Sequence, residues 1–414
     1  MLAYPKNIIF DYKTYKLYNQ FMNKLPNGWT EYKLKDIMSI SSKRYNPNKD
    51  TKNYKCIELE HIESETGILN GHTNSKDIHS VKNIFEKGEV LYGKLRPYLK
   101  KFYLAKFDGV CSSEIWVLKG KKVINDFLYY FIQQDNFNYI ANVSIGMIMP
   151  RADWSYMSEI SFNIPPLDEQ KRIASALSKI DAYLENTVKL IEEKERFKRG
   201  IAKKLLTCKE GENIPEARFK GFEDEWEIFK LGDMFDNFKE KNNEDKIILA
   251  STIDKGVIPN SLTERKIIRK KESLSNYKLV KKGCFVISLM SFQSGFEYSD
   301  YEGIISPAYS VLKPKIEMAH YFYKYYFKSF KFIKDLRPYA EGIRHGKQIK
   351  FKACKDILVP YPSIEEQEKI GGYLSLLDEE IDNLKKQKEL IKEMKRGAMQ
   401  KLLSGEVRLV DNYD

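Results

Sequence analysis

The chain is poor in residues that build disulfide or metal frameworks. It has five cysteines in 414 residues, and no two of them form a Cys-x-x-Cys pair. An odd, scattered set of this kind supports neither a disulfide framework nor a zinc site. The five histidines show no ligand spacing. We therefore expect no metal bound by this chain.

Long hydrophobic runs are also missing. The longest apolar stretch, residues 284–290, has the length of a strand and is far too short to span a bilayer. Residues 1–12 lack the basic region and the long apolar run of a signal peptide. These absences predict a soluble, cytoplasmic protein with no membrane partner.

Three segments resemble catalytic motifs, and each is incomplete. Residues 163–166 differ from the Asn-Pro-Pro-Tyr loop of adenine methyltransferases, because Ile164 intrudes and no glycine-rich turn for S-adenosylmethionine lies upstream. Residues 342–348 are one residue short of a phosphate-binding loop and lack its Ser/Thr metal ligand. Asp168-Glu169 could belong to a nuclease cluster, but acidic residues at a helix start suit the helix dipole. No catalytic residue or cofactor site is predicted.

The chain does contain an internal repeat. An offset of 197 residues carries Trp29 onto Trp226, and residues about 24–206 and about 221–403 form two copies of one unit. The same offset relates Leu34 to Leu231, Asp181 to Asp378 and Arg199 to Arg396. A period this long indicates a duplicated domain and not a solenoid. The middles of the copies have diverged, which predicts one scaffold that presents two different recognition surfaces.

Each copy ends in a long amphipathic segment. Residues 167–207 and 364–404 follow proline signals for a helix start, and glycines follow them. Each helix would be ~60 Å long. Their apolar residues recur with a 3.5-residue period: Ile173, Leu177, Ile180, Leu184 and Ile191, then Ile370, Leu374, Leu377, Ile381, Leu384 and Ile391. This stripe needs a partner, either the other helix or the helix's own globular domain. Its narrow, sustained form favours the other helix.

Basic and aromatic runs are the positive signal for a ligand. The net charge of +12 favours a polyanion or an acidic partner. Residues 94–106 hold five basic side chains and no acidic one, and residues 265–282 hold eight basic side chains and one acidic. Lysine and arginine contact phosphates, and arginine can also fork onto guanine. The alternative is a solvated strand edge that lysines protect from aggregation.

A duplicated unit suits double-stranded DNA. Two-fold proteins bind two half-sites, so two diverged copies would bind two unlike half-sites. The candidate DNA-binding residues are Lys94, Arg96, Tyr98, Lys100, Lys101, Arg151, Arg265, Lys266, Arg269, Lys270, Arg344 and Lys347. For Arg96 and Arg151 the alternative role is to brace a loop by pairing with a nearby carboxylate.

Several short motifs, in order and repeated, resemble a known family. They are Gly28-Trp29-x4-Leu34-x-Asp36 with its copy at 225–233, Pro165-Pro166-Leu167-x-Glu169-Gln170 with a looser copy at 362–367, and the segments 93–98 and 149–154. The second copy lacks the last two, and has Ser291-Phe292-Gln293 and His345-Gly346-Lys347 near the equivalent places. The chain resembles the specificity (S) subunit of type I restriction–modification systems over nearly its whole length.

The resemblance implies an α+β fold, with two mixed target-recognition domains separated by two long helices. These helices would pack as an antiparallel coiled coil with an internal pseudo-two-fold repeat. The expected domains are an extension at 1–22, recognition domains at 23–163 and 222–358, a helical spacer at 164–221 and a distal helical region at 359–414.

The resemblance also implies partners. Each recognition domain would bind one half of a bipartite, asymmetric duplex site. Two modification subunits would methylate adenine N6 with S-adenosylmethionine, and restriction subunits would use ATP and Mg²⁺, while this chain binds no cofactor. The expected docking residues are Pro165, Glu169, Gln170, Pro362, Glu366 and Gln367.

Two other classes of function compete with this interpretation. One is a catalytic enzyme, such as a nuclease or a fused methyltransferase, against which the incomplete motifs count. The other is a coiled-coil scaffold that binds only protein. Affinity for duplex DNA, measured with and without modification subunits, discriminates between them.

Overall fold

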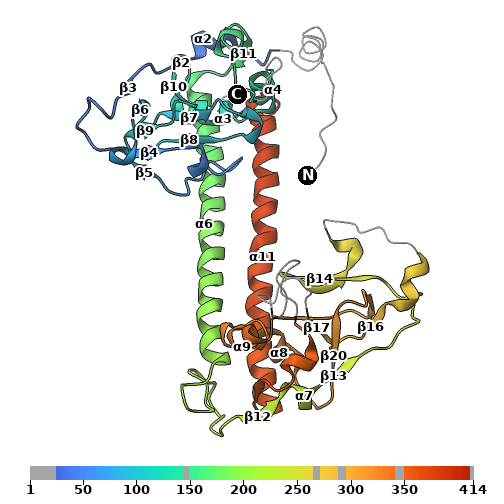
Figure 1. Ribbon diagram of the computed structural model, residues 1–414. Coiled ribbons are helices and arrows are strands. Elements are labelled where there is room, and N and C mark those ends of the chain that lie inside the picture. The colour runs from blue at the N-terminus through green and yellow to red at the C-terminus, as the bar shows by residue number, and fades with distance from the viewer. Residues whose placement is uncertain (1–24, 144–148, 264–270, 288–294, 341–348, 411–414) are drawn as a thin grey trace. The chain divides into compact units, whose positions relative to one another are not determined.

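The computed structural model describes residues 25–143, 149–263, 271–287, 295–340 and 349–410. The chain divides into two compact units (Figure 1). Unit 1 comprises the chain up to Val188 together with Gln387 onward, and unit 2 comprises Lys189–Lys386. Each unit therefore contains part of both long helices. The sequence-based domains, which gave each helix a region of its own, differ from these units.

The same frame encloses both recognition regions. In unit 1, β1 (Thr30–Lys33) pairs antiparallel with β11 (Ser161–Ile164), and in unit 2, β12 (Glu227–Lys230) pairs antiparallel with β21 (Leu358–Tyr361). The short helices α2 (Leu34–Ile37) and α7 (Leu231–Met234) follow β1 and β12, while α5 (Trp154–Met157) and α10 (Phe351–Cys354) precede β11 and β21. Each of these elements in unit 2 begins 197 residues after its counterpart in unit 1.

A four-stranded antiparallel sheet forms the centre of unit 1, in the order β2-β10-β7-β8. The strands are β2 (Met38–Ile40), β10 (Ile115–Gly120), β7 (Val90–Gly93) and β8 (Phe102–Leu104). Alternate side chains of β10 enter different cores. Trp116 and Leu118 join the core beside the helices, whereas Ile115 and Val117 join a second core on the other face. A strand buried on both faces has a nearly continuous apolar sequence, as here.

Further elements cover the two faces of this sheet. The helices α3 (Asn125–Phe131) and α4 (Asp135–Ala141) contribute aromatic residues to the first core. Residues of β4, β6 and β9 contribute to the second core. They belong to a five-stranded sheet of β3 (Arg44–Tyr45), β6 (Lys82–Phe85), β9 (Gly109–Cys111), β4 (Lys55–Ile57) and β5 (Thr73–Asn74), in which β4 and β9 are parallel.

Unit 2 repeats the four-stranded sheet and changes the rest. The order is β13 (Phe235–Phe238), β20 (Ser310–Pro314), β17 (Phe285–Ile287) and β18 (Phe296–Tyr298). The helices α8 (His320–Tyr326) and α9 (Phe330–Leu336) supply its aromatic core. In place of one five-stranded sheet, the described part of unit 2 has two pairs, β14 (Leu249–Thr252) with β15 (Gly256–Pro259) and β16 (Lys278–Val280) with β19 (Gly303–Ile305). A parallel bridge between Ile248 and Ile304 links the two pairs.

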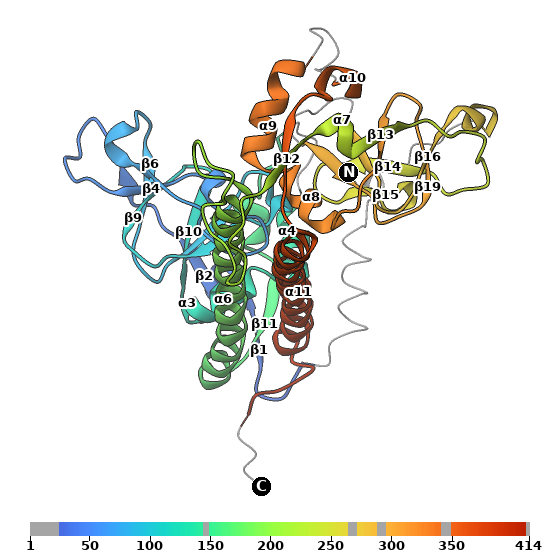
Figure 2. The same cartoon turned by 90° about the horizontal axis from the view of Figure 1, so that it is seen from below.

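The long helices are α6 (Leu167–Leu206) and α11 (Ile364–Leu403), of 40 residues each. Every expected stripe residue is buried except Ile180 and Leu384, which are half-buried. Ile173 and Leu177 of α6 pack in the globular core of unit 1 together with Leu402 and Leu403 of α11. The first turns therefore pack on their own globular domain, so the expectation of a purely helix-on-helix stripe needs correction there. Figures 1 and 2 show the unit 1 part of α11 beside α6.

Candidate nucleic-acid interface

Two segments that are distant in sequence lie side by side in unit 1. Leu95 and Arg151 form an antiparallel bridge. The Arg96 amide donates to the Pro150 carbonyl at 2.8 Å, and the Ala152 amide donates to the Lys94 carbonyl at 2.9 Å. The family-like segments 93–98 and 149–154 thus form one surface.

A strained turn presents side chains on this surface. Arg96 and Lys100 adopt left-handed backbone conformations, with φ of 51° and 47°, on either side of a 3-10 turn at Pro97–Leu99. Each such residue costs ~1–3 kcal/mol and persists only where the surroundings enforce it. The turn leaves Arg96 exposed and Tyr98 54% exposed. Strain of this kind is common at ligand-binding sites.

Arg96 is a cation of this surface that has no partner among the described residues. Its guanidinium has no hydrogen bond or ion pair with any residue that the structure describes. Lys94 is half-buried close by. An unpaired guanidinium beside an exposed aromatic ring can contact a phosphate, fork onto a base edge, or stack with one.

Arg151 makes a different contact. Its Nε and Nη2 atoms donate to the two carboxylate oxygens of Glu114, each at 3.0 Å. This pairing raises the pKa of Arg151 and lowers the pKa of Glu114. The Lys94 amide also donates to the Glu114 carbonyl, at 2.9 Å. Arg151 therefore braces the two segments, and its contact with DNA stays a prediction.

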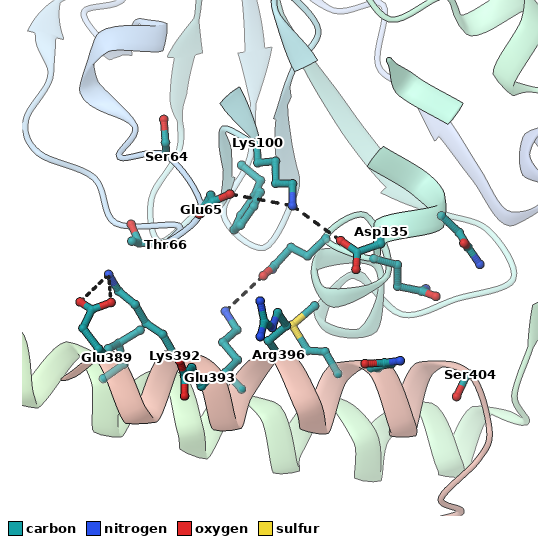
Figure 3. Close-up of a pocket in the computed structure, with 18 of the residues that line it drawn as sticks. Ser64, Glu65, Thr66, Lys100, Asp135, Glu389, Lys392, Glu393, Arg396 and Ser404 are labelled. Atoms are coloured by element: carbon teal, nitrogen blue, oxygen red, sulfur yellow. Dashed lines mark hydrogen bonds and ion pairs between the residues drawn. The ribbon is translucent and has the colours of Figure 1, made fainter. Parts of the chain in front are cut away.

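Lys100 and Lys101 are also engaged within unit 1. The Lys101 Nζ donates to the Leu59 carbonyl at 2.7 Å. The Lys100 Nζ lies 3.8 Å from Glu65 and 3.6 Å from Asp135, beside a groove of about 820 Å³ (Figure 3). These partly exposed pairs contribute little to stability. They nevertheless direct Lys100 toward carboxylates.

The other candidate DNA-binding residues fall outside the described part of the chain. They are Arg265, Lys266, Arg269, Lys270, Arg344 and Lys347. The second-copy segments near 291–293 and 345–347 lie there too. The candidate interface is therefore built here from unit 1 alone.

The six expected docking residues are all buried in their own unit. Glu169, 1% exposed, accepts from the Trp29 indole Nε1 at 3.0 Å and from Arg408 at 2.7 and 2.8 Å. These hydrogen bonds lower the pKa of Glu169, although burial alone would raise it. A buried side chain offers no surface to a partner, so the docking expectation for these residues is corrected. They anchor the long helices.

The same anchor recurs in unit 2. Glu366 accepts from the Trp226 indole Nε1 at 2.9 Å and from Arg218 through two bonds of 2.8 Å. Sequence reasoning missed both arginines, because Arg218 and Arg408 are 190 residues apart in number and do not follow the 197-residue offset. The one available signal was a lone arginine shortly after each helix.

The adjacent glutamines bind the backbone just before α3 and α8. The Gln170 Oε1 accepts from the Ile124 amide at 3.0 Å, and its Nε2 donates to the Pro165 carbonyl at 3.0 Å. The Gln367 Oε1 accepts from the Ala319 amide at 2.9 Å, and its Nε2 donates to the Pro362 carbonyl at 2.8 Å. Each Glu-Gln pair thus ties a long helix to the β-strand frame and to the recognition domain.

Comparison with known proteins identifies the frame. A model of the family described as Type I restriction modification DNA specificity domain matches residues 26–195 and 223–393. The chain belongs to this family. It is a specificity subunit of the type I restriction–modification class, and such subunits are non-catalytic and serve in DNA recognition.

Individual relatives agree. The type I restriction enzyme EcoDI specificity subunit of Escherichia coli is 31% identical over 179 residues, which are 42% of this chain and 40% of that protein. The putative type I restriction enzyme MjaX specificity subunit of Methanocaldococcus jannaschii is 24% identical over 420 residues, covering 94% of this chain and 96% of that protein. The solved type I S subunit from M. genitalium shares the fold, with a TM-score of 0.54 at 17% identity over 92% of this chain and 97% of that chain.

The described residues of this specificity subunit include no cluster of three or more histidine, cysteine or acidic side chains able to hold a metal ion. Within the same residues, no helix has the length and apolarity needed to cross a membrane.

Proposed function

We propose that this subunit recognises a bipartite, asymmetric duplex DNA site, one half with each unit. The observation that carries the proposal is the pairing of a repeated frame with unlike inserts. The frame elements keep one offset, whereas the strands outside the frame differ. Unit 1 holds a five-stranded sheet, and the described part of unit 2 holds two strand pairs linked by a parallel bridge between Ile248 and Ile304. A common scaffold with different exposed surfaces suits two different half-sites. In unit 1, the exposed Arg96–Tyr98 turn is the proposed contact.

The long helices are proposed to form an antiparallel coiled coil that sets the distance between the half-sites. Support comes from each unit separately. In unit 1, Leu177 near the start of α6 shares a core with Leu402 near the end of α11. In unit 2, Leu205 near the end of α6 shares a core with Leu374 near the start of α11. In each unit the start of one long helix thus shares a core with the end of the other, which supports opposite helix directions and a pseudo-two-fold repeat.

Two modification subunits are the proposed partners, and they would carry S-adenosylmethionine and methylate adenine N6. Restriction subunits with ATP and Mg²⁺ would join them. The helices expose large apolar side chains in both units, Leu190 and Phe197 in unit 2 and Leu390 and Met394 in unit 1. Phe197 and Met394 correspond under the 197-residue offset. An apolar patch rimmed by charged residues suits a protein interface, and one patch in each unit suits two partners.

The direct test of function is methylome sequencing of a host with and without the gene. The proposal predicts the loss of one bipartite N6-methyladenine motif upon deletion. An unchanged methylome, in a host whose modification subunits are expressed, would refute it. The mass of the purified complex tests the stoichiometry, and a stable one-to-one complex would contradict the two-partner assignment.

A further inference from the structure

In unit 1 a single carboxylate joins three elements. Asp181 lies on α6. Its Oδ2 atom accepts from the hydroxyl of Tyr130 on α3 at 2.9 Å, and its Oδ1 atom lies 2.7 Å from the Nζ of Lys395 on α11. The Lys395 Nζ also donates to the Gln133 side chain at 3.1 Å, just beyond α3. Asp181 on α6 therefore connects this helix to both α3 and α11.

Unit 2 contains the same arrangement with the long helices exchanged. Asp378 lies on α11, and its Oδ2 atom accepts from the hydroxyl of Tyr325 on α8 at 2.7 Å. Its Oδ1 atom pairs with Lys198 of α6. In each unit the lysine also lies over the tyrosine ring, at 5.6 Å for Lys395 and 4.9 Å for Lys198. We call these two triads the helix nodes.

The helix nodes are related by the internal repeat. Asp181 corresponds to Asp378, and Lys198 corresponds to Lys395, both at 197 residues. Each long helix gives its aspartate to one node and its lysine to the other. The tyrosines come from α3 and α8, within the more divergent part of the copies. Both copies keep the triad although Tyr130 and Tyr325 do not follow the 197-residue offset, which indicates a shared structural requirement.

Burial determines what such a triad can contribute. Lys395 is only 6% exposed, and its charge is tolerated there because the carboxylate neutralises it. Burial, and then the nearby aspartate, raise the pKa of Tyr130 far above its ordinary value, so the hydroxyl remains a donor. A buried ion pair contributes little net stability, but it can fix one register among several. The triad therefore contributes more to the choice of one helix register than to the free energy of folding.

We propose that the helix nodes position each recognition domain on the helix pair and fix the helix register, and thereby determine which gap between half-sites the protein accepts. This inference rests on the proposed function. A one-turn slip of a helix moves its side chains ~5.4 Å, compared with ~3.4 Å for one base pair. Such a slip separates Asp181 from Lys395 well beyond ion-pair distance. By preventing this slip, the helix nodes exclude binding to DNA sites in which the gap between the half-sites has another length.

The test uses the complete complex with its modification subunits and a series of duplexes. The duplexes carry the native motif with its own gap or with a gap one base pair shorter or longer. The variants are Asp181→Asn and Asp378→Asn, together with Tyr130→Phe, which retains the ion pair and removes only the hydroxyl. The matched control is Glu380→Gln, since Glu380 forms an interhelical ion pair with Lys194 at 2.6 Å but is largely exposed.

The expected result is a change in gap preference. The affinity ratio between the native gap and the altered gaps should fall about tenfold in Asp181→Asn and Asp378→Asn, or ~1.4 kcal/mol. It should fall less in Tyr130→Phe and not at all in Glu380→Gln. An equal loss of affinity on all duplexes, or an unchanged ratio in folded variants, would overturn this inference alone. A wild-type complex that shows no sequence preference would overturn the proposed function.

Discussion

Removal of the Glu169 carboxylate should destabilise unit 1 strongly, because three donors converge on it. Trp29 Nε1 and two nitrogens of Arg408 donate to its oxygens, and Trp29 is itself buried. In Glu169→Ala the indole N–H loses its acceptor inside the core, and Arg408 loses the partner that holds residues after α11 against the start of α6.

The magnitude follows from the burial of each group. A buried N–H without an acceptor costs ~1–3 kcal/mol. The loss of the Arg408 pair adds less than a fully buried pair would, because the arginine side chain is partly exposed. The sum is about 2–4 kcal/mol. For a unit of roughly 200 residues this corresponds to a fall in Tm of about 4–16 °C.

The assay is thermal unfolding followed by calorimetry and by tryptophan fluorescence. The matched control is Asp168→Ala, which alters the neighbouring residue of the same helical turn. Asp168 is exposed, and among the residues that the structure describes it pairs only with Lys171, at 3.2 Å, so its loss should cost less than about 1 kcal/mol. Equal Tm values for the two variants would refute the assignment of Glu169 as an anchor.

Three further predictions concern DNA contact, pH and assembly. Arg96→Ala should weaken DNA binding by ~1–3 kcal/mol if the guanidinium contacts a base. If it contacts a phosphate, the slope of the logarithm of the binding constant against the logarithm of the salt concentration should fall by about one. Arg151→Ala should mainly lower Tm, and the reverse pattern in salt titrations and melting curves would contradict the proposed interface. The pKa of Glu169 is lowered, so its contribution to stability is present above the unfolded pKa of ~4.3 and is lost as pH falls through the folded pKa. The difference in the free energy of unfolding between wild type and Glu169→Gln, measured by denaturant titration, should therefore shrink below about pH 4. The double variant Phe197→Asp/Met394→Asp should keep Tm and DNA affinity nearly unchanged but bind the modification subunits more weakly. If a mass measurement shows full assembly of this variant, the modification subunits dock elsewhere.

The sequence predicts the frame well because its signals are local. The long helices were expected at 167–207 and 364–404, and they end within one residue of those limits. Proline and glycine mark such boundaries by restricting the backbone at the position itself. Residues 125–137 read as one helix-like stretch in the sequence, whereas the structure has two helices there, because α3 ends at Phe131 and α4 starts at Asp135. Its apolar residues do not distinguish one helix from two that pack on the same core.

Non-local features could not be predicted in this way. The parallel pairing of β4 with β9 joins residues more than fifty positions apart, and no local pattern specifies it. The docking expectation for Glu169 and Glu366 failed for a similar reason. Acidic residues at a helix start are commonly exposed, and their burial here depends on Trp29 and Arg408, or Trp226 and Arg218, which are brought in by the tertiary fold.

The most direct test of the central claim is an exchange of one recognition domain. Residues 24–163 are replaced by the equivalent segment of another specificity subunit with a known motif, and the methylome of the host is sequenced. If each unit recognises its own half-site, one half of the methylated motif should change while the other half and the gap stay the same. A simultaneous change in both halves, or a loss of methylation from a folded and assembled complex, would contradict the account.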